Sequence, residues 1–203
     1  MVIAIIIITS LISIYAFTNQ AIFDKFRFNA YFIRHQNEGW RFLTYGFLHA
    51  NWAHLVINMF VLYSFGKTVL SVYQVLFGAK AYVYFLLLYI GGIIFSVLVD
   101  FGKNKDNVYY NAVGASGAVS AIVFASILLY PAGKIMLFPI PFPIPSVIFG
   151  VLYLIYSAYM ARRGTGNIGH SAHFWGAVFG IAFTIALKPA IAVTFIDQLK
   201  SMI

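Results

Sequence analysis

Long apolar segments alternate with polar segments along the whole chain. Each apolar segment reaches or approaches the roughly 20 residues that cross a bilayer, and none alternates every second residue as barrel strands do. In chain order these segments are Met1–Phe17, His49–Val72, Ala79–Val99, Ala115–Tyr130, Ser146–Ala161 and His170–Ala192. Only helices and closed barrels satisfy their backbone in lipid. We therefore predict an all-α, polytopic membrane protein, with residues 1–203 forming a single domain of six transmembrane helices.

The polar connections differ in character. The first, Thr18–Phe47, is long and aromatic, and connections of that length are usually structured or functional. We predict a structured loop there, a loop at Asp100–Ala112, a basic glycine-rich loop at Arg162–Gly169 and a short tail. Four prolines, which exclude helix, predict an extended connector before the fifth span. They are Pro139, Pro141, Pro143 and Pro145.

Composition supports a membrane protein. Hydrophobic residues make up 62% of the chain and charged residues 9%, and the mean hydropathy is +0.89. The net charge of +8 comes from basic residues scattered singly in loops, which favours contact with anionic lipid headgroups over nucleic acid. The absence of cysteine excludes disulfides, thiol catalysis and cysteine-ligated metal. The first span lacks the basic start and cleavage pattern of a signal peptide, so we expect it to be retained.

Ser116 stands where a polar loop meets the fourth apolar segment, between Gly114 and Gly117. If a helix begins there, Ser116 lies in its first turn, where unpaired N–H groups and the positive end of the dipole favour negative charge. This is the setting of a nucleophile beside an oxyanion site. The alternative from this stretch alone is a small-residue interface between membrane helices.

Histidines and one asparagine are the polar groups that favour a functional reading, because ionisable groups inside spans are costly. His54 and Asn58 share a helix face, and His49 lies one turn earlier. His173 forms a stripe with Gly176 and Gly180, and these glycines would let another helix approach. If that helix is the fourth span, His173 meets Ser116. The alternatives are an interhelical hydrogen-bond pair for His54 with Asn58, and solvated rings for His49 and His170.

A metal site is a further alternative, since four histidines could supply nitrogens. They are His49, His54, His170 and His173. The chain has no HExxH motif and no acidic residue inside a span to complete a hydrolytic zinc site. We predict no metal and no cofactor.

The ordered set of motifs resembles the rhomboid intramembrane serine proteases. The matching stretches are His49–Asn58 in the second span, Gly114-Ala-Ser116-Gly117 in the fourth, and Ala172-His173-Phe-Trp-Gly176 with Gly180 in the sixth. Glu38-Gly-Trp40-Arg41 is similar to the family's Trp-Arg element in the first loop. Order, spacing and span number together cover nearly the whole chain.

The resemblance implies a catalytic dyad without an acid, with Ser116 as nucleophile and His173 as general base. His54, Asn58 and the Ser116 backbone N–H would form the oxyanion hole. The supporting positions would be His49, Trp40, Arg41 and the motif glycines Gly114, Gly117, Gly176 and Gly180. The first loop would brace the bundle, and the fifth span with the loop after it would gate substrate entry. The substrates would be transmembrane helices of other proteins in the lipid bilayer, cut near the outer end at a small residue.

The sequence departs from the family pattern at two positions. Family members often carry an aromatic residue one turn after the nucleophile, on which the catalytic histidine stacks, and this chain has Ser120 there. An acidic residue is common where the second span ends, and the nearest match is Leu70. These departures leave open what braces His173.

Two other functions remain open. One is a rhomboid-like membrane protein that binds client helices without cutting them, which the intact Ser116 and His173 disfavour. The other is a transporter with a pathway of His54, Asn58 and His173, which the absence of broken-helix repeats disfavours.

Orientation follows from the resemblance, which places both termini in the cytoplasm, in a bacterial plasma membrane. With that orientation, the outer connections carry eight Lys and Arg residues and the inner segments carry five. The positive-inside rule therefore disfavours it. Four of the eight lie in the first connection, which we expect to be a folded element. We therefore predict the N-terminus inside.

Overall fold

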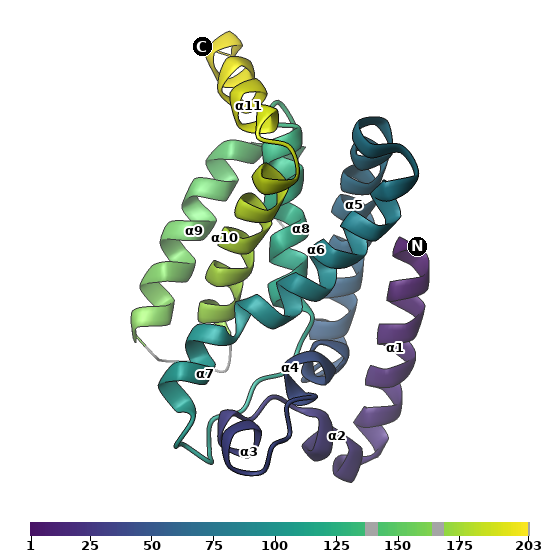
Figure 1. Ribbon diagram of the computed structural model, residues 1–203, viewed down its shortest axis with the longest axis vertical. Coiled ribbons are helices and arrows are strands. Elements are labelled where there is room, and N and C mark those ends of the chain that lie inside the picture. Colours follow the sequence, from purple (N-terminus) through teal and green to yellow (C-terminus); the bar gives the residue numbers. More distant parts are fainter. Residues whose placement is uncertain (137–141, 164–168, 203) are drawn as a thin grey trace.

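The computed structural model describes residues 1–136, 142–163 and 169–202. Helices dominate this part of the chain, with one small two-stranded sheet (Figure 1). The long helices are α1 (Val2–Thr18), α5 (Trp52–Phe77), α6 (Ala81–Ser96), α8 (Ser116–Leu129), α9 (Ser146–Arg163), α10 (His170–Leu187) and α11 (Ala190–Ser201). The short ones are α2 (Gln20–Phe26), α3 (Ala30–His35), α4 (Arg41–Thr44), α7 (Leu98–Asn104) and the 3₁₀ turns η1 (Tyr45–Phe47) and η2 (Gly78–Lys80). The strands β1 (Lys134–Ile135) and β2 (Ile144–Pro145) pair antiparallel.

Helix α8 stands at the centre of the bundle (Figure 1). Twelve of its fourteen residues are buried, and it contacts α5, α6, α9 and α10. A helix that is apolar on every side must be surrounded, because it has no polar face for solvent. Small residues on α8 let its neighbours approach closely.

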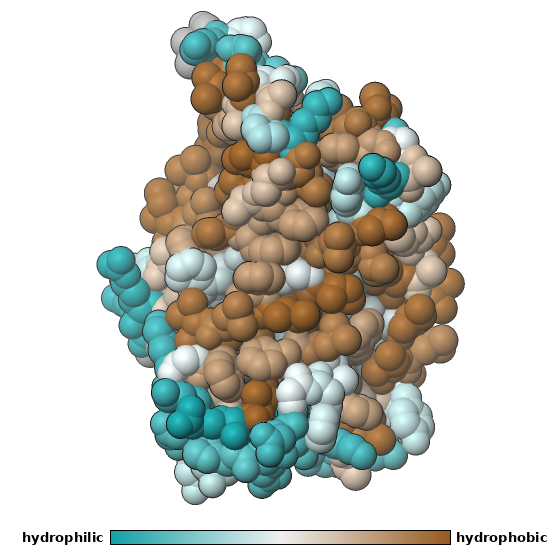
Figure 2. All heavy atoms as spheres, viewed as in Figure 1, coloured by the Kyte–Doolittle hydropathy of each residue, from teal (hydrophilic) through white to brown (hydrophobic). Residues whose placement is uncertain are grey.

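The outside of the bundle is apolar at mid-height. Large side chains such as Leu11, Phe60, Val83 and Ile155 are more than half exposed. Figure 2 shows hydrophobic atoms over the middle of the visible face and hydrophilic atoms gathered at the lower end. A soluble monomer rarely exposes so much contiguous apolar surface, so this belt is the surface that contacts lipid.

By length and composition, two helical stretches qualify as candidate membrane spans, Trp52–Asn104 and His170–Leu187. The first contains α5, α6 and α7, and so includes two of the predicted spans. Val2–Thr18 and Ser116–Leu129 are apolar but shorter. The predicted helical class is confirmed, and the number of six spans stays a prediction.

Several predicted boundaries were wrong. The second span begins at Trp52 because Asn51 caps the helix, with its side-chain oxygen accepting from the His54 N–H. The predicted loop at Asp100–Ala112 begins inside α7, and α9 continues through Arg163. Pro189 ends the sixth span early, and the predicted tail is the helix α11.

Other predicted connections are confirmed where the structure describes them. The first connection is structured, with α2, α3, α4 and η1 folded at the lower end of the bundle (Figure 1). Pro145 lies in β2, which agrees with an extended connector. Pro139 and Pro141, and residues 164–168 of the predicted glycine-rich loop, lie outside the described residues.

The two chain ends lie toward the upper end of the bundle, while α2 and α3 lie at the lower end (Figure 1). Lys25 in α2 and Lys80 in η2 are both exposed.

Because the chain has no cysteine, single cysteines at these positions can be labelled selectively. With the N-terminus inside, a membrane-impermeant maleimide added to intact cells should label the cysteine at position 25 and spare the one at position 80. Both should label after the membrane is permeabilised, and the reverse pattern in intact cells would invert the orientation.

Candidate active site

Ser116 is the first residue of α8. The preceding backbone turns at Gly114, whose φ of +125° is a conformation that L side chains rarely adopt. Ala115 at the N-cap makes no side-chain capping bond, so within the described residues no side chain caps the first N–H groups of α8. The sequence prediction that Ser116 lies in the first turn of a helix is confirmed. Those N–H groups are placed to bind negative charge beside the hydroxyl.

The folded first connection holds the segment that leads into Ser116. Phe28 and Ala112 exchange backbone hydrogen bonds of 2.9 and 3.1 Å. The Gly114 N–H donates to the Tyr45 carbonyl oxygen over 3.0 Å. The segment that leads into Ser116 is therefore positioned by a distant part of the chain as well as by its own helix.

Arg41 organises that connection. Its side chain is buried, its Nε donates to the Glu38 carboxylate, and its Nη1 donates to the carbonyl oxygens of Asp24 and Arg27 over 2.9 and 2.8 Å. Arg41 thus ties the start of α4 to the end of α2. Trp40, its predicted companion, is 46% exposed and lies on the surface beside this network.

Helix α10 packs against α8 with almost no side chain between them. A Cβ on Gly176 would overlap the Gly117 carbonyl oxygen, and a Cβ on Gly180 would overlap the Ala121 carbonyl oxygen. The residues therefore pair in register along the two helices. His173, one turn before Gly176 on the same stripe, lies level with the segment that starts at Gly114 and holds Ser116.

The sequence prediction that the glycine stripe of α10 packs on the start of α8 is confirmed. The described residues include no hydrogen bond between the Ser116 hydroxyl and the His173 ring. Catalytic hydrogen bonds are often long until substrate binds.

The His54 ring lies against Gly114. A Cβ at Gly114 would stand 3.0 Å from His54 Nε2 and 3.7 Å from Ser116 Oγ, so α5 and α8 bring these two atoms to one place. The Ala50 N–H donates to His54 Nδ1 over 3.4 Å. In the neutral ring the proton then lies on Nε2, which makes this atom a hydrogen-bond donor facing the Ser116 side.

Asn58 is buried one turn further along α5, and its Nδ2 donates to the His54 carbonyl oxygen over 2.8 Å. The second hydrogen of that amide remains available as a donor. His49 is fully buried before α5, with Nδ1 2.9 Å from Ser13 Oγ. Its ring meets the His54 ring edge to face at 4.9 Å between centroids. His49 thus contacts both Ser13 of α1 and the His54 ring, and the solvated alternative for His49 is wrong.

The ring contacts join these four histidines in two pairs, of which His49 with His54 is the first. The second pair is His170 and His173, with ring centroids 6.0 Å apart. His170 is buried, so the expectation of a solvated ring there is wrong. Among the described residues, no three histidine or acidic side chains form a group that could hold a metal ion.

Tyr153 of α9 is a neighbour of His173 that sequence reasoning missed. Its ring is stacked on the His173 ring, with centroids 6.2 Å apart and planes 25° apart. An aromatic partner thus stands beside His173 although position 120 carries a serine. A signal was available, because Gly150, Tyr153 and Ser157 fall at i, i+3 and i+7, the same spacing as the stripe on α10.

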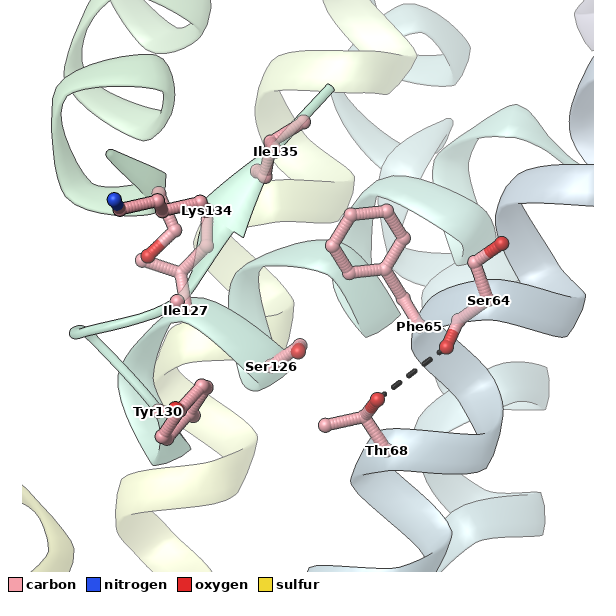
Figure 3. Close-up of a pocket in the computed structure, with 10 residues that line it drawn as sticks. Ser64, Phe65, Thr68, Ser126, Ile127, Tyr130, Lys134 and Ile135 are labelled. Carbon is pink, nitrogen blue, oxygen red and sulfur yellow. Dashed lines mark hydrogen bonds between the residues drawn. The ribbon is translucent and has the colours of Figure 1, made fainter. Parts of the chain in front are cut away.

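A cavity of about 310 Å³ lies at the other end of α8 (Figure 3). Figure 3 shows its side chains coming from α5, the end of α8 and β1. They include Ser64, Phe65, Thr68, Ser126, Tyr130 and Lys134. Ser126 lies ten residues after Ser116, which is about 15 Å along the helix. This cavity is therefore separate from the predicted catalytic residues.

Comparison with known proteins decides the family. The family model described as the Rhomboid domain matches residues 36–190, well over half of the chain. The chain belongs to the rhomboid family. The matched range contains every site residue predicted from the sequence. Rhomboids are multi-pass membrane proteins.

Similar curated proteins carry rhomboid names. RHOMBOID-like protein 12, mitochondrial, of Arabidopsis thaliana is 30% identical over 66% of this chain and 42% of its own length. Presenilin-associated rhomboid-like protein A, mitochondrial, of Danio rerio is 30% identical over 66% of this chain and 34% of its own. Rhomboid protein 1, mitochondrial, of Saccharomyces cerevisiae is 26% identical over 71% of this chain and 41% of its own. The chain thus matches less than half the length of these relatives.

Close contact between α8 and α10 leads to a prediction about Gly176. Gly176→Ala forces the two backbones apart, because the Gly117 carbonyl oxygen cannot move aside as a flexible side chain can. We expect a loss of about 1–3 kcal/mol, which lowers Tm in detergent by several degrees.

The control is Gly102→Ala in α7, where an added Cβ meets nothing within 4 Å. It should leave Tm unchanged or raise it slightly, because Ala favours helix over Gly. Equal Tm values for Gly176→Ala and the parent would contradict the register described above.

Proposed function

We propose that this chain is an intramembrane serine endopeptidase whose dyad is Ser116 and His173. The observation that carries the proposal is the convergence of three helices on one point. Helix α8 presents Ser116, the register of α10 brings His173 level with it, and α5 sets His54 against Gly114. Residues 1–203 would form one domain of six spans.

The reaction follows from ordinary serine chemistry. His173 accepts the hydroxyl proton as Ser116 Oγ attacks the scissile carbonyl carbon. The resulting oxyanion accepts hydrogen bonds from His54 Nε2–H, the Asn58 amide and the Ser116 backbone N–H. His173 then gives the proton to the leaving amine, and water hydrolyses the acyl-enzyme by the reverse sequence.

The length of α8 explains how water could reach this site. Its fourteen residues span about 21 Å, shorter than the roughly 30 Å hydrocarbon core. If Tyr130 lies near one face of the bilayer, Ser116 lies about 10 Å below the other. The polar residues around Ser116 would then line a depression open to that side, where hydrolysis has water.

The substrates would be transmembrane segments of other proteins, entering from the lipid between α5 and α9. A small apolar cluster separates these helices. It contains Val123, Phe124 and Ile127 of α8, with Val61 and Phe65 of α5 and Tyr153 and Leu154 of α9 packed around it. This packing is mainly apolar, with the contact of 2.9 Å between the Ser120 and Tyr153 hydroxyls as a polar link between α8 and α9, and it suits a gate formed by α9.

The expected bacterial plasma membrane gains no support from the relatives, whose names place them in mitochondria. What carries over to this chain is a multi-pass membrane location. The cytoplasmic N-terminus stays a prediction that depends on the labelling experiment above.

The proposed serine-protease mechanism predicts how variants of Ser116 and His173 behave. Ser116→Ala and His173→Ala should each abolish cleavage of a model transmembrane substrate, and the double variant should be no worse, because the pair acts as a unit. A fluorophosphonate probe should label the parent and neither single variant. The control is Ser126→Ala, a serine on the same helix near the distant cavity, which should retain labelling and cleavage.

Cleavage that survives Ser116→Ala would end this proposal. Activity lost with EDTA and restored by zinc would favour a metal enzyme. A folded parent that binds substrate helices, without labelling or cleavage, would favour the client-binding alternative.

The oxyanion hole leads to a prediction about His54. His54→Ala removes the Nε2–H donor, and loss of one such donor costs roughly 10²–10³ in rate. We expect kcat to fall by that factor with little change in KM, measured with the transmembrane substrate in detergent. The control is His35→Ala in α3, where the ring is exposed and contacts Asp106, and it should keep the parental kcat. A rise in KM with unchanged kcat would instead make His54 a substrate contact.

A further inference from the structure

The ring of His173 has few neighbours that could hold it in one orientation. Within the part of the chain that the structure describes, neither ring nitrogen of His173 makes a hydrogen bond. Among the described residues, no carboxylate is ion-paired with that ring as in an acid-containing triad. Two aromatic rings contact it among the described residues. The His170 ring lies edge-on, with ring centroids 6.0 Å apart and ring planes at 80°. The Tyr153 ring is stacked, with centroids 6.2 Å apart and planes at 25°. The Tyr153 ring lies nearly parallel to the imidazole and so restricts rotation of its plane.

Tyr153 is itself fixed from both sides. Its hydroxyl lies 2.9 Å from Ser120 Oγ, one turn after Ser116 on α8. Its ring contacts Phe149 of its own helix and Phe124 of α8, with centroids 5.6 and 5.8 Å away. Gly150 adds to this, because its missing side chain lets α9 approach Ile127 and Phe124. One tyrosine thus contacts both helices that carry the proposed dyad.

Ser120 makes this arrangement possible. The side chain at position 120 is small and buried, and its hydroxyl binds Tyr153. A large ring at position 120 would compete for the space between α8 and His173 that Tyr153 occupies. The serine therefore both leaves room for Tyr153 and holds it by a hydrogen bond.

We propose that Tyr153 is the positioning residue for His173, supplied by α9 in place of an aromatic residue on α8. This inference rests on the proposed protease function and adds a consequence to it. Because α9 is the proposed gate, any outward movement of α9 carries the stacking ring away from the base. The alignment of His173 with Ser116 is then coupled to closure of α9, so the base is ordered only when the gate is packed against the bundle.

The test compares substitutions at positions 153 and 120 in the full chain in detergent. Tyr153→Phe keeps the ring and loses the bond to Ser120, and we expect kcat and the rate of fluorophosphonate labelling within about twofold of the parent. Tyr153→Leu fills the space without a ring. It should lower both rates about tenfold, the size of one aromatic contact, with KM nearly unchanged.

Ser120→Tyr should act oppositely in two backgrounds. Combined with Tyr153→Leu, it supplies a ring from α8 and should restore most of the lost rate. In the parent, it forces two rings into one space and should lower both Tm and rate. Tyr159→Ala is the matched control, because Tyr159 is an exposed tyrosine on the same helix and should leave both rates unchanged.

Parental rates in folded Tyr153→Leu would overturn the proposal, as would failure of Ser120→Tyr to restore any rate in the Tyr153→Leu background. An equal loss in Tyr153→Phe and Tyr153→Leu would overturn it too, because the hydroxyl and not the ring would then matter.

A parent that never labels at Ser116 would instead defeat the protease function, and the contact is then tested without activity. The ring-proton NMR signals of His173, assigned with His173→Ala, should shift in Tyr153→Leu and stay in place in Tyr159→Ala. Unshifted signals in Tyr153→Leu would overturn the positioning role independently of catalysis.

Discussion

The direct contact between the backbones of α8 and α10 is the constraint on which the site depends. Gly176 faces the Gly117 carbonyl and Gly180 faces the Ala121 carbonyl, with no room for a Cβ at either glycine. In lipid, where apolar side chains gain little by leaving one apolar surrounding for another, such close packing is a main source of helix association. It also sets the register, because sliding α10 by one residue would put a side chain against a carbonyl. The register in turn decides that His173 stands beside the start of α8.

A second constraint acts on the other side of Ser116. The segment before α8 is held by backbone bonds to Phe28 and Tyr45, and these belong to a connection that Arg41 ties together through three acceptors. A buried arginine is costly unless its donors are satisfied, and here two carbonyl oxygens and a carboxylate accept three hydrogen bonds from it. The first connection is thus a rigid brace, and the positive φ at Gly114 is kept by bonds on both sides of it. Ser116 and His173, the proposed nucleophile and base, are thus held by different parts of the fold.

Much of this could be predicted from residue spacing. The apolar runs predicted an all-α membrane protein, and three short motifs predicted that His54, Ser116 and His173 belong together. Spacing also predicted that the stripe of His173, Gly176 and Gly180 would face the start of the fourth apolar segment. The helical class and the packing of the glycine stripe are confirmed, because helical periodicity is local and a glycine stripe has little use except close approach. Helix ends were less predictable, since the cap at Asn51 and the helix α11 depend on local hydrogen bonds and packing that apolar runs do not encode.

What the sequence by itself determined is the class of fold, the family and the set of residues that could form a dyad and an oxyanion hole. Only the tertiary structure decided what surrounds those residues. Ser120 alone suggests a missing aromatic partner, yet Tyr153 fills that place from a helix 33 positions away in sequence. The same is true of His49, whose burial against Ser13 of α1 no local pattern predicts. The physical reason is that a side chain's partner across a helix interface depends on the register and tilt of two helices, which are set by all the contacts of the bundle together.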